Sequence, residues 1–415
     1  MSRKFLRNGA VMSGVTGAIR KAFSTTAPAR AGLVAAFALP ALLLGTHAPA
    51  APQVWTLQNP AVPDAVSPTL VGVSCPSANA CIAVGSGISL PSGDPVALAE
   101  SWNGTAWTIE STPSAAGSSL ASVSCQSPTD CTAVGATSQD GSTQPLAESW
   151  NGTAWTMART PSLGGATAGA LSGVSCTSAT RCVAVGYARQ GEGTIPLSDT
   201  WNGTTWRPLA APLPAGSADG SFSRVSCTSR DACVAVGSVD EQGGGYVPLA
   251  ESWDGTNWSL QSTPLPTGSY TGNFGAVSCS SASLCTAVGF YYIAASGSPA
   301  ETLAEVWNGT SWSQEHTPAL AHSGFYGISC SRSARCTAVG YQDQGKLALA
   351  EQWNGTKWNV DHGVVSPPRH VNAMTFDDVS CPTAAVCEAV GGYDGYEMAA
   401  NKVDRGEFPL AEQRT

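Results

Sequence analysis

The chain has 415 residues, of which 43% are hydrophobic and 12% are charged, and it carries 14 cysteines. Its formal charge is −9, but the first fifty residues hold six basic side chains and no acidic one, so residues 51–415 keep 14 basic against 29 acidic side chains, a formal charge of −15. This acidic balance, with no basic stripe, argues against nucleic acid and anionic membrane as partners.

The first fifty residues have the pattern of a secretory signal peptide. Basic residues such as Arg3, Lys4 and Arg20 precede an apolar run over 31–45, and Ala48-Pro49-Ala50 fits a small-residue cleavage site. The apolar run is shorter than the ~20 residues that a membrane-spanning helix needs, which favours cleavage over an uncleaved anchor. We therefore expect a domain of residues 51–415 that is secreted by the Sec route and does not insert into a membrane.

The cysteines form seven Cys-x5-Cys pairs that recur every 50 to 52 residues. An even number of cysteines on a secretory route predicts disulfides, and each pair is placed to join the two strands of one hairpin. No histidine or cysteine spacing matches a zinc site, so we predict neither a metal nor a cofactor. The predicted disulfides are Cys75/Cys81, Cys125/Cys131, Cys176/Cys182, Cys227/Cys233, Cys279/Cys285, Cys330/Cys336 and Cys381/Cys387.

Each repeat has the pattern of four short strands. In the second repeat we expect strands over 120–125, 131–135, 145–150 and 153–157, with a polar loop over 136–144. Asn151-Gly152 would form a two-residue type I′ turn, which needs positive φ at both central positions. A period of about fifty residues with four strands is typical of a β-propeller blade.

The two ends of the chain predict how the ring closes. A Trp-(Asn/Asp)-Gly-Thr-x-Trp motif follows each of the first six cysteine pairs, but the seventh is followed only by Pro409-Leu410-Ala411-Glu412. The missing strand is found around Trp55, which has no repeat of its own. These complementary halves favour an all-β, seven-bladed propeller, its last blade closed by the N-terminal strand, over an open solenoid, since closure removes exposed sheet edges.

Two further residue types recur with the repeat. The asparagine of Asn-Gly-Thr is replaced by Asp254 in one copy, which favours a role in a turn over N-glycosylation. The third strand of every repeat carries one acid, and a residue needed seven times is expected to be a structural hydrogen-bond acceptor. These acids are Glu100, Glu148, Asp199, Glu251, Glu305, Glu351 and Glu412.

The repeats resemble those of kelch and galactose-oxidase-like propellers over residues 53–415. The shared features are a glycine that ends the second strand, as in Ala-Val-Gly, and a tryptophan in the fourth strand. The double glycine of kelch repeats occurs only at Gly391-Gly392. Residues 101–107 also resemble an Asp-box that is one residue short, the turn motif of sialidase-type propellers. Both resemblances imply a fold and no particular activity.

The loops fall on two faces. The Cys-x5-Cys loops and Asn-Gly turns share a nearly uniform face, hereafter the cysteine-loop face. The loops between strands two and three and the blade connections vary, and they share the opposite, variable face, where we expect the function. The innermost strands carry small residues at the axis except at Arg224 and Asp378. Phe222, Phe274, Phe325 and Phe376, which stand five residues before a cysteine, are assigned to the core.

The candidate ligand-binding residues are the two axial charges and the aromatic, acidic and basic residues of the later repeats. They are Arg224, Asp378, Asp377, His370, Arg369, Tyr326, Tyr291, Tyr292, Tyr393 and Tyr396. Aromatic rings beside acids and amides suit carbohydrate, whose C–H faces pack on rings, and they suit protein surfaces equally. The sequence contains no Gly-x-Ser-x-Gly elbow, His-Glu-x-x-His motif or phosphate loop.

These features together predict a secreted, monomeric, non-catalytic binding propeller. Its expected ligand is an extracellular glycan, a cell-envelope polymer or a protein, bound on the variable face. One alternative is a glycoside hydrolase or polysaccharide lyase that uses Asp377, Asp378 and His370 at the same face. The other alternative is a purely structural surface protein.

Overall fold

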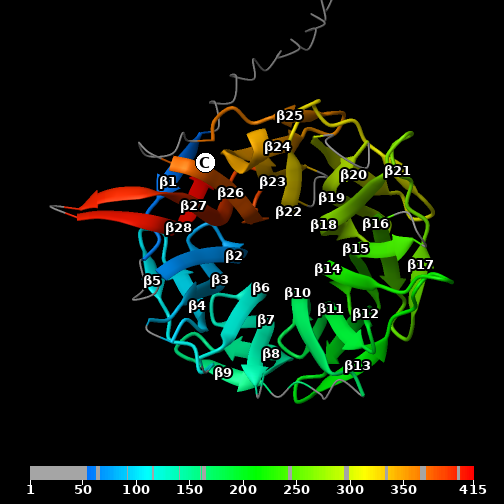
Figure 1. Ribbon diagram of the computed structural model, residues 1–415, viewed down its shortest axis with the longest axis horizontal. Helices are drawn as coiled ribbons and strands as arrows, with labels where there is room; N and C mark the ends of the chain where they lie inside the picture. The colour runs from blue at the N-terminus through cyan, green and yellow to red at the C-terminus, as the bar shows by residue number, and fades with distance from the viewer. Residues whose placement is uncertain are drawn as a thin grey trace, which may run out of the picture. The chain divides into compact units, whose positions relative to one another are not determined.

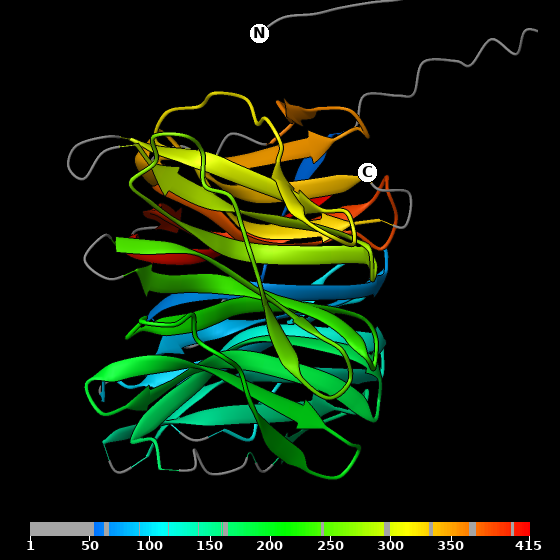
Figure 2. The same cartoon turned by 90° about the vertical axis from the view of Figure 1, so that its right-hand side faces the viewer.

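The computed structural model describes residues 54–61, 66–90, 92–114, 116–139, 141–158, 160, 165–241, 245–293, 299–331, 335–364, 371–399 and 402–415. All of them belong to one compact unit, Pro52–Thr415. Its seven four-stranded antiparallel sheets surround a central opening as the blades of a β-propeller (Figure 1). Figure 2 shows the same sheets from the side. The predicted signal peptide lies outside the described residues.

Six blades use four consecutive strands each. Blades one to three are β2 (Val66–Ser77), β3 (Ala80–Ile88), β4 (Pro95–Trp102), β5 (Trp107–Ile109); β6 (Ser118–Ser127), β7 (Asp130–Gln139), β8 (Ser142–Trp150), β9 (Trp155–Ala158); and β10 (Ala168–Ser178), β11 (Arg181–Gln190), β12 (Gly193–Trp201), β13 (Trp206–Ala210). Blades four to six are β14 (Gly220–Ser229), β15 (Ala232–Glu241), β16 (Gly245–Trp253), β17 (Trp258–Gln261); β18 (Thr271–Ser281), β19 (Leu284–Tyr292), β20 (Ala300–Trp307), β21 (Trp312–Gln314); and β22 (Gly324–Cys330), β23 (Cys336–Gln342), β24 (Leu347–Trp353), β25 (Trp358–Val360).

Blade seven joins the two ends of the chain, as predicted. Its sheet has the order β1-β28-β27-β26, with strands β1 (Trp55–Gln58), β26 (Val371–Ser380), β27 (Cys387–Ala399) and β28 (Lys402–Arg414). The one helical segment in the described part of the chain is the single 3-10 turn η1 (Asp343–Gly345).

Trp55 anchors the closing strand. It lies opposite Arg414 in the β1–β28 pair, is 1% exposed, and stacks on Phe376 with 5.8 Å between ring centroids. Its indole N–H donates to Asp361 over 2.9 Å. In the other six blades two tryptophans face each other at this register, but here the Arg414 guanidinium lies 5.7 Å from the centroid of the Trp55 ring. A cation–π contact thus replaces a tryptophan pair at the closure.

Two bonded features repeat in every blade. All seven predicted disulfides form, one within each first hairpin. The serine before each first cysteine accepts a hydrogen bond of 2.9–3.0 Å from the backbone N–H of the first cysteine in the next blade. The series begins with Ser74 and Cys125 and ends with Ser380 and Cys75, so the seven bonds form a closed serine belt.

The second cysteine of every disulfide is part of the apolar core. Whereas the sequence places these residues at the ends of loops on one face, the structure buries them to 0–5% exposure and packs each into a cluster between blades. They are Cys81, Cys131, Cys182, Cys233, Cys285, Cys336 and Cys387. Of these seven cysteines, only Cys182 lines one of the two cavities described below. The other six therefore have a structural role.

The apolar core lies between neighbouring blades. One cluster, for example, joins Ile82 and Val84 of blade one to Leu120, Leu146 and Trp155 of blade two. The four phenylalanines assigned to the core are 0–2% exposed, which confirms that prediction. Because each blade covers one face of the next, the core exists only when the blades are stacked in a ring.

The prediction of a loop over 136–144 was wrong. Strand β7 continues to Gln139 and β8 begins at Ser142, so most of this polar stretch is paired backbone. The hairpin extends beyond the buried part of the blade, where backbone hydrogen bonds hold the strands and side-chain hydrophobicity gives no signal.

The prediction of a two-residue type I′ turn was also wrong. Trp150 pairs with Trp155, which leaves a four-residue loop, and of its residues only Gly152 has positive φ, at 92°. Asn151 Oδ1 accepts hydrogen bonds from the N–H groups of the second and third residues after it, both over 2.9 Å. Asp254 Oδ1 accepts the equivalent two bonds over 2.8 and 2.7 Å. Since only the oxygen is used, aspartate replaces asparagine without loss of the turn.

The closure can be tested by Trp55→Ala. Loss of a buried indole should lower the free energy of unfolding by about 3–5 kcal/mol, measured by urea denaturation. The neighbouring Val54 is 53% exposed, so Val54→Ala should change it by less than about 0.5 kcal/mol. Equal unfolding free energies for the two variants would contradict an anchoring role of Trp55.

Candidate functional site

Every innermost strand carries a β-bulge at the same place. The pairing with the second strand skips one residue, which stands four positions before the first cysteine. The residues on either side of it, five and three positions before the cysteine, are both paired. The innermost strands border the central opening (Figure 1), so these bulge residues surround the axis. The bulge residues are Val71, Ala121, Ser172, Ser223, Gly275, Tyr326 and Asp377.

Arg224 stands directly after a bulge and bonds to the backbone. One guanidinium nitrogen donates to the carbonyls of Ser172 over 2.7 Å and Ser223 over 3.2 Å, and the other donates to the carbonyl of Val71 over 3.2 Å. All three acceptors are bulge residues, from blades three, four and one. Arg224 therefore spans the axis and ties three blades together, rather than presenting a free charge to a ligand.

Asp378 also bonds to the backbone of the ring. Its carboxylate accepts hydrogen bonds from the N–H of Val73 in blade one over 3.1 Å and of Val379 over 2.9 Å. Ser122 plays the same part between blades two and three, where its Oγ accepts from Val174 N over 3.3 Å. Burial raises the pKa of Asp378, while the charge of Arg224 and these hydrogen bonds act to lower it.

Asp377 is the axial acid without such bonds: the structure shows no hydrogen bond from any described residue to its carboxylate. Burial raises its pKa to about 6, against a lowering influence of Arg224 and a further rise from the charge of Asp378. Burial and the charge of Asp377 both raise the pKa of Tyr326. The Tyr326 ring packs against Tyr341 with 5.2 Å between centroids. The axis thus places Asp377, Tyr326 and Arg224 of the predicted set near one another.

Three predicted tyrosines lie elsewhere or outside the described residues. Tyr291 donates to Glu301 over 2.6 Å and packs against the core of blade five, and burial together with this carboxylate raises its pKa to about 12. Tyr393 stacks on Phe408 over 5.2 Å within blade seven. The side chain of Tyr396, together with Arg369 and His370, lies outside the described residues.

A cavity of about 400 Å³ opens on the variable face over blades three to five. Tyr246, Phe290 and Tyr292 supply its aromatic surface, and the rings of Phe290 and Tyr292 meet edge to face at 5.7 Å. Asn273 and Ser221 are among its polar residues, and Asn273 Oδ1 has no hydrogen-bond partner among the described residues. None of the ten residues that line the cavity carries a formal charge.

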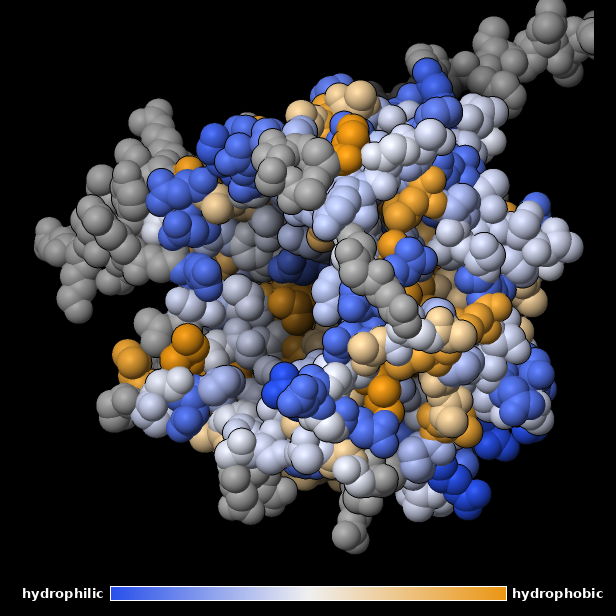
Figure 3. All heavy atoms as spheres, turned by 45° about the vertical axis from the view of Figure 1, so that its right-hand side comes forward, coloured by the Kyte–Doolittle hydropathy of each residue, from blue (hydrophilic) through white to orange (hydrophobic). Residues whose placement is uncertain are grey.

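Sequence reasoning found this cavity only in part. Tyr292 is the one predicted ligand-binding residue that lines it, whereas the polar residues were missed. Their signal was weak, because Ser221, Thr271 and Asn273 look like ordinary strand starts in the sequence. The surface view in Figure 3 shows hydrophobic and polar residues interspersed over the visible face, around a hollow near its middle.

The strand-three acids are buried and incompletely paired. Glu100 accepts a hydrogen bond from the N–H of Ala61 over 2.9 Å, as expected of a structural acceptor. Glu251, Glu305 and Glu351 are fully buried, and neither carboxyl oxygen of any of them has a hydrogen-bond partner among the described residues. Burial raises the pKa of each of these three to about 8. A raised pKa favours the protonated carboxyl group over the carboxylate in the folded protein.

Comparison with known proteins identifies the fold of this chain but not its function. The sequence matches no established family and no curated protein. Among solved structures it is similar to YCF48 bound to a D1 peptide, with 14% identity, a TM-score of 0.52, and 88% of this chain and 96% of that chain covered. It is also similar to the WD40 β-propeller domain of Doa1, with 11% identity, a TM-score of 0.53, and 87% and 97% covered. This chain is a seven-bladed β-propeller.

A further solved propeller, YCF48 from Cyanidioschyzon merolae, aligns with 14% identity, a TM-score of 0.51, and 86% of this chain and 98% of that chain covered. Identities this low establish a shared fold and leave the function to the site itself. In the described part of the propeller, no helix is long and apolar enough to cross a membrane, and no group of three or more His, Cys, Asp or Glu side chains is placed to hold a metal ion.

The role of Arg224 is testable by Arg224→Ala. Three charge-assisted hydrogen bonds across the axis are lost, so the free energy of unfolding should fall by about 2–4 kcal/mol in chemical denaturation. The exposed Arg189→Ala is the control and should leave it within about 0.5 kcal/mol. If Arg224→Ala unfolds at the same denaturant concentration as the parent, Arg224 does not tie the blades together.

The buried acids predict a pH dependence of stability. The pKa of Glu251 is about 8 in the folded protein against an ordinary value of 4.5, so its contribution is fully present below pH 4.5 and is lost as pH rises toward 8. Glu251→Gln removes this loss. The unfolding free energy of the variant relative to the parent should therefore rise from pH 5 to pH 8, with a slope of about one proton.

The exposed Asp254 provides the control for this series. Its pKa is lowered by hydrogen bonds from Thr256 and Asn257, so Asp254→Asn should give no relative gain between pH 5 and pH 8. A Glu251→Gln difference that stays constant across this range would show that the buried acid is not protonated in the folded protein.

Proposed function

We propose that this protein is a secreted, non-catalytic binding propeller whose ligand is an uncharged carbohydrate, held in the variable-face cavity over blades three to five. The observation that carries the proposal is the lining itself: three aromatic rings, several hydroxyls and one amide, without a charged side chain, around about 400 Å³. Rings offer flat surfaces for sugar C–H groups, and the hydroxyls and amide offer hydrogen bonds to sugar hydroxyls.

The shape of the cavity favours a small ligand over a protein surface. Its volume falls in the range of roughly 300–1,000 Å³ that is typical of small-molecule sites. A stable protein partner would instead need roughly 800 Å² of contact on each side, which a single cavity does not supply. One or two sugar units of a longer polymer are the ligand that fits best.

The lining also favours binding over hydrolysis. A glycosidase needs two carboxyl groups about 5–9.5 Å apart on either side of the scissile bond, and the ten lining residues include none. At the axis, the Asp378 carboxylate is occupied by two backbone N–H groups.

Secretion is supported by the disulfides. Seven disulfides and no free cysteine among the described residues fit an oxidising compartment, and the predicted signal peptide provides a route to it. The protein would act as a monomer, since the closed ring leaves no unpaired end blade to recruit a second copy.

The function is tested by screening purified residues 51–415 on neutral polysaccharides and, for the lyase alternative, on polysaccharides that contain uronic acid. Retention without release of reducing or unsaturated sugar ends would support binding, and product release would instead establish the hydrolase or lyase. A protein that is retained by no polysaccharide would favour the structural alternative.

The cavity is tested on a retained polysaccharide with Tyr292→Ala. Loss of the ring should weaken binding about tenfold or more, measured by affinity electrophoresis or calorimetry. Tyr292→Phe keeps the ring and should bind within about threefold of the parent. Tyr187→Ala removes a half-buried tyrosine of blade three that does not line the cavity, and it should not affect binding. Equal weakening by both alanine variants would place the site elsewhere.

A further inference from the structure

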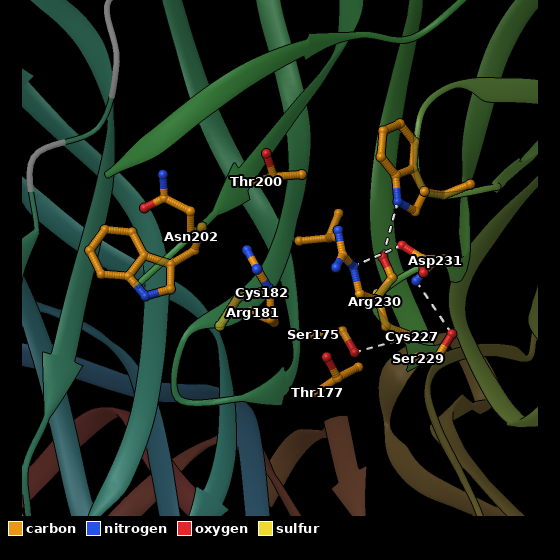
Figure 4. A pocket seen from close by; sticks show the side chains of 14 residues that line it. Ser175, Thr177, Arg181, Cys182, Thr200, Asn202, Cys227, Ser229, Arg230 and Asp231 are labelled. Carbon is orange, nitrogen blue, oxygen red and sulfur yellow. Dashed lines mark hydrogen bonds and ion pairs between the residues drawn. The ribbon is translucent and has the colours of Figure 1, made fainter. Parts of the chain in front are cut away.

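A second cavity, of about 140 Å³, opens on the cysteine-loop face between blades three and four. Figure 4 shows it from close by. Its walls come from β10, β11 and β12 on one side and from β14, the loop between β14 and β15, and the end of β16 on the other. It lies on the face opposite the proposed carbohydrate cavity, and the two share no lining residue.

Two arginines from neighbouring blades line this cavity. Arg181 forms no hydrogen bond or ion pair with any described residue. Arg230 forms an exposed ion pair with Asp231, with 3.0 Å between Nε and Oδ1. Two guanidinium groups against one carboxylate leave a net positive charge, and guanidinium stays charged at any physiological pH.

The hydroxyl groups of the cavity can act as donors to a ligand. Ser175 Oγ already accepts the serine-belt hydrogen bond from Cys227 N over 3.0 Å, and Ser229 Oγ accepts from Asp231 N over 3.3 Å. Each of these oxygens has therefore used a lone pair on the protein and keeps its own hydrogen for a ligand. Thr177 contributes one more hydroxyl to the lining.

This arrangement is specific to one of the seven gaps between blades. Two positions face the same gap. One is the residue just before the second cysteine of a blade, and the other is the third residue after the first cysteine of the next blade. Only between blades three and four are both of them arginine, Arg181 and Arg230. Between blades two and three, for example, they are Asp130 and Ala179. The arginine pair is thus no consequence of the repeat.

We propose that this cavity binds a single oxyanion, namely the carboxylate, sulfate or phosphate group of a small ligand, through Arg181 and Arg230. The planar forks of guanidinium groups match the paired oxygens of such anions, and the hydroxyls complete the donor set. Residues 51–415 carry a formal charge of −15, which repels anions at long range, so binding depends on these local donors. Asp231 competes with the ligand for Arg230.

The test is a calorimetric or NMR titration of residues 51–415 with sodium sulfate, sodium phosphate and sodium acetate, with sodium chloride holding the ionic strength constant. The parent should bind at least one of the three at about millimolar affinity. Preference for sulfate or phosphate would identify a tetrahedral group, and preference for acetate would identify a carboxylate. No saturable binding of any of them up to about 50 mM would overturn the proposal.

Three variants give effects of different sign. Arg181→Ala should weaken binding of the preferred anion about tenfold, because its guanidinium is lost. Asp231→Asn should strengthen binding by about threefold or more, because Arg230 loses its competing carboxylate. Arg189→Ala removes an exposed arginine of the same blade outside the cavity and should leave binding unchanged.

All three side chains are exposed, so melting temperatures close to that of the parent would confirm that the variants fold. Unchanged binding by Arg181→Ala, or equal weakening by Arg189→Ala, would mean that the anion responds to general surface charge and would refute the site. Because the carbohydrate cavity lies on the other face, either result leaves the proposed function to be judged on its own test.

Discussion

The hydrogen bond from each first cysteine to the serine of the preceding blade holds the ring at its axis. The innermost strand of a blade is an edge strand, and its outward N–H and C=O groups have no neighbouring strand to pair with. The serine belt satisfies one N–H per junction, and Ser122 and Asp378 satisfy a second N–H at two of them. Arg224 donates hydrogen bonds to three bulge carbonyls. Seven sheet edges thus become one bonded ring without forming a continuous sheet.

Because the axial side chains bond to backbone groups of the ring, the proposed ligand sites lie farther out. Gly327 shows how closely neighbouring blades approach there, since a Cβ on it would come within 2.7 Å of the Asp378 backbone in the next blade. Both proposed sites lie away from the axis, one on each face. One face offers an uncharged aromatic cavity, and the other offers a small cavity with a net positive charge. The repeated residues form the propeller, and residues that depart from the repeat at a few positions supply the binding groups of the cavities.

The sequence predicted the ring because closure is encoded locally, in a cysteine period and in two complementary half-repeats around Trp55 and Glu412. Aligning residues 409–414 with 145–150 puts Arg414 at the tryptophan position, but the packing of its guanidinium on Trp55 depends on the register of β1 with β28, which emerges only in three dimensions. The invariant serines were visible, but their partners lie one blade away. The cavities were missed for the same reason: Thr194, Tyr246 and Asn273 are far apart in the chain, and only the packing of three blades brings them to one wall.

The joining of β1 to β28 also sets an order of events during synthesis. Trp55 is among the first residues of the domain to leave the ribosome, and its partner strand is among the last. Local hairpins can form early because their contacts are close in sequence, but the final sheet must wait for nearly the whole domain. Until then Trp55 has no burial site, and the chain carries an open blade edge that is prone to pair with other chains.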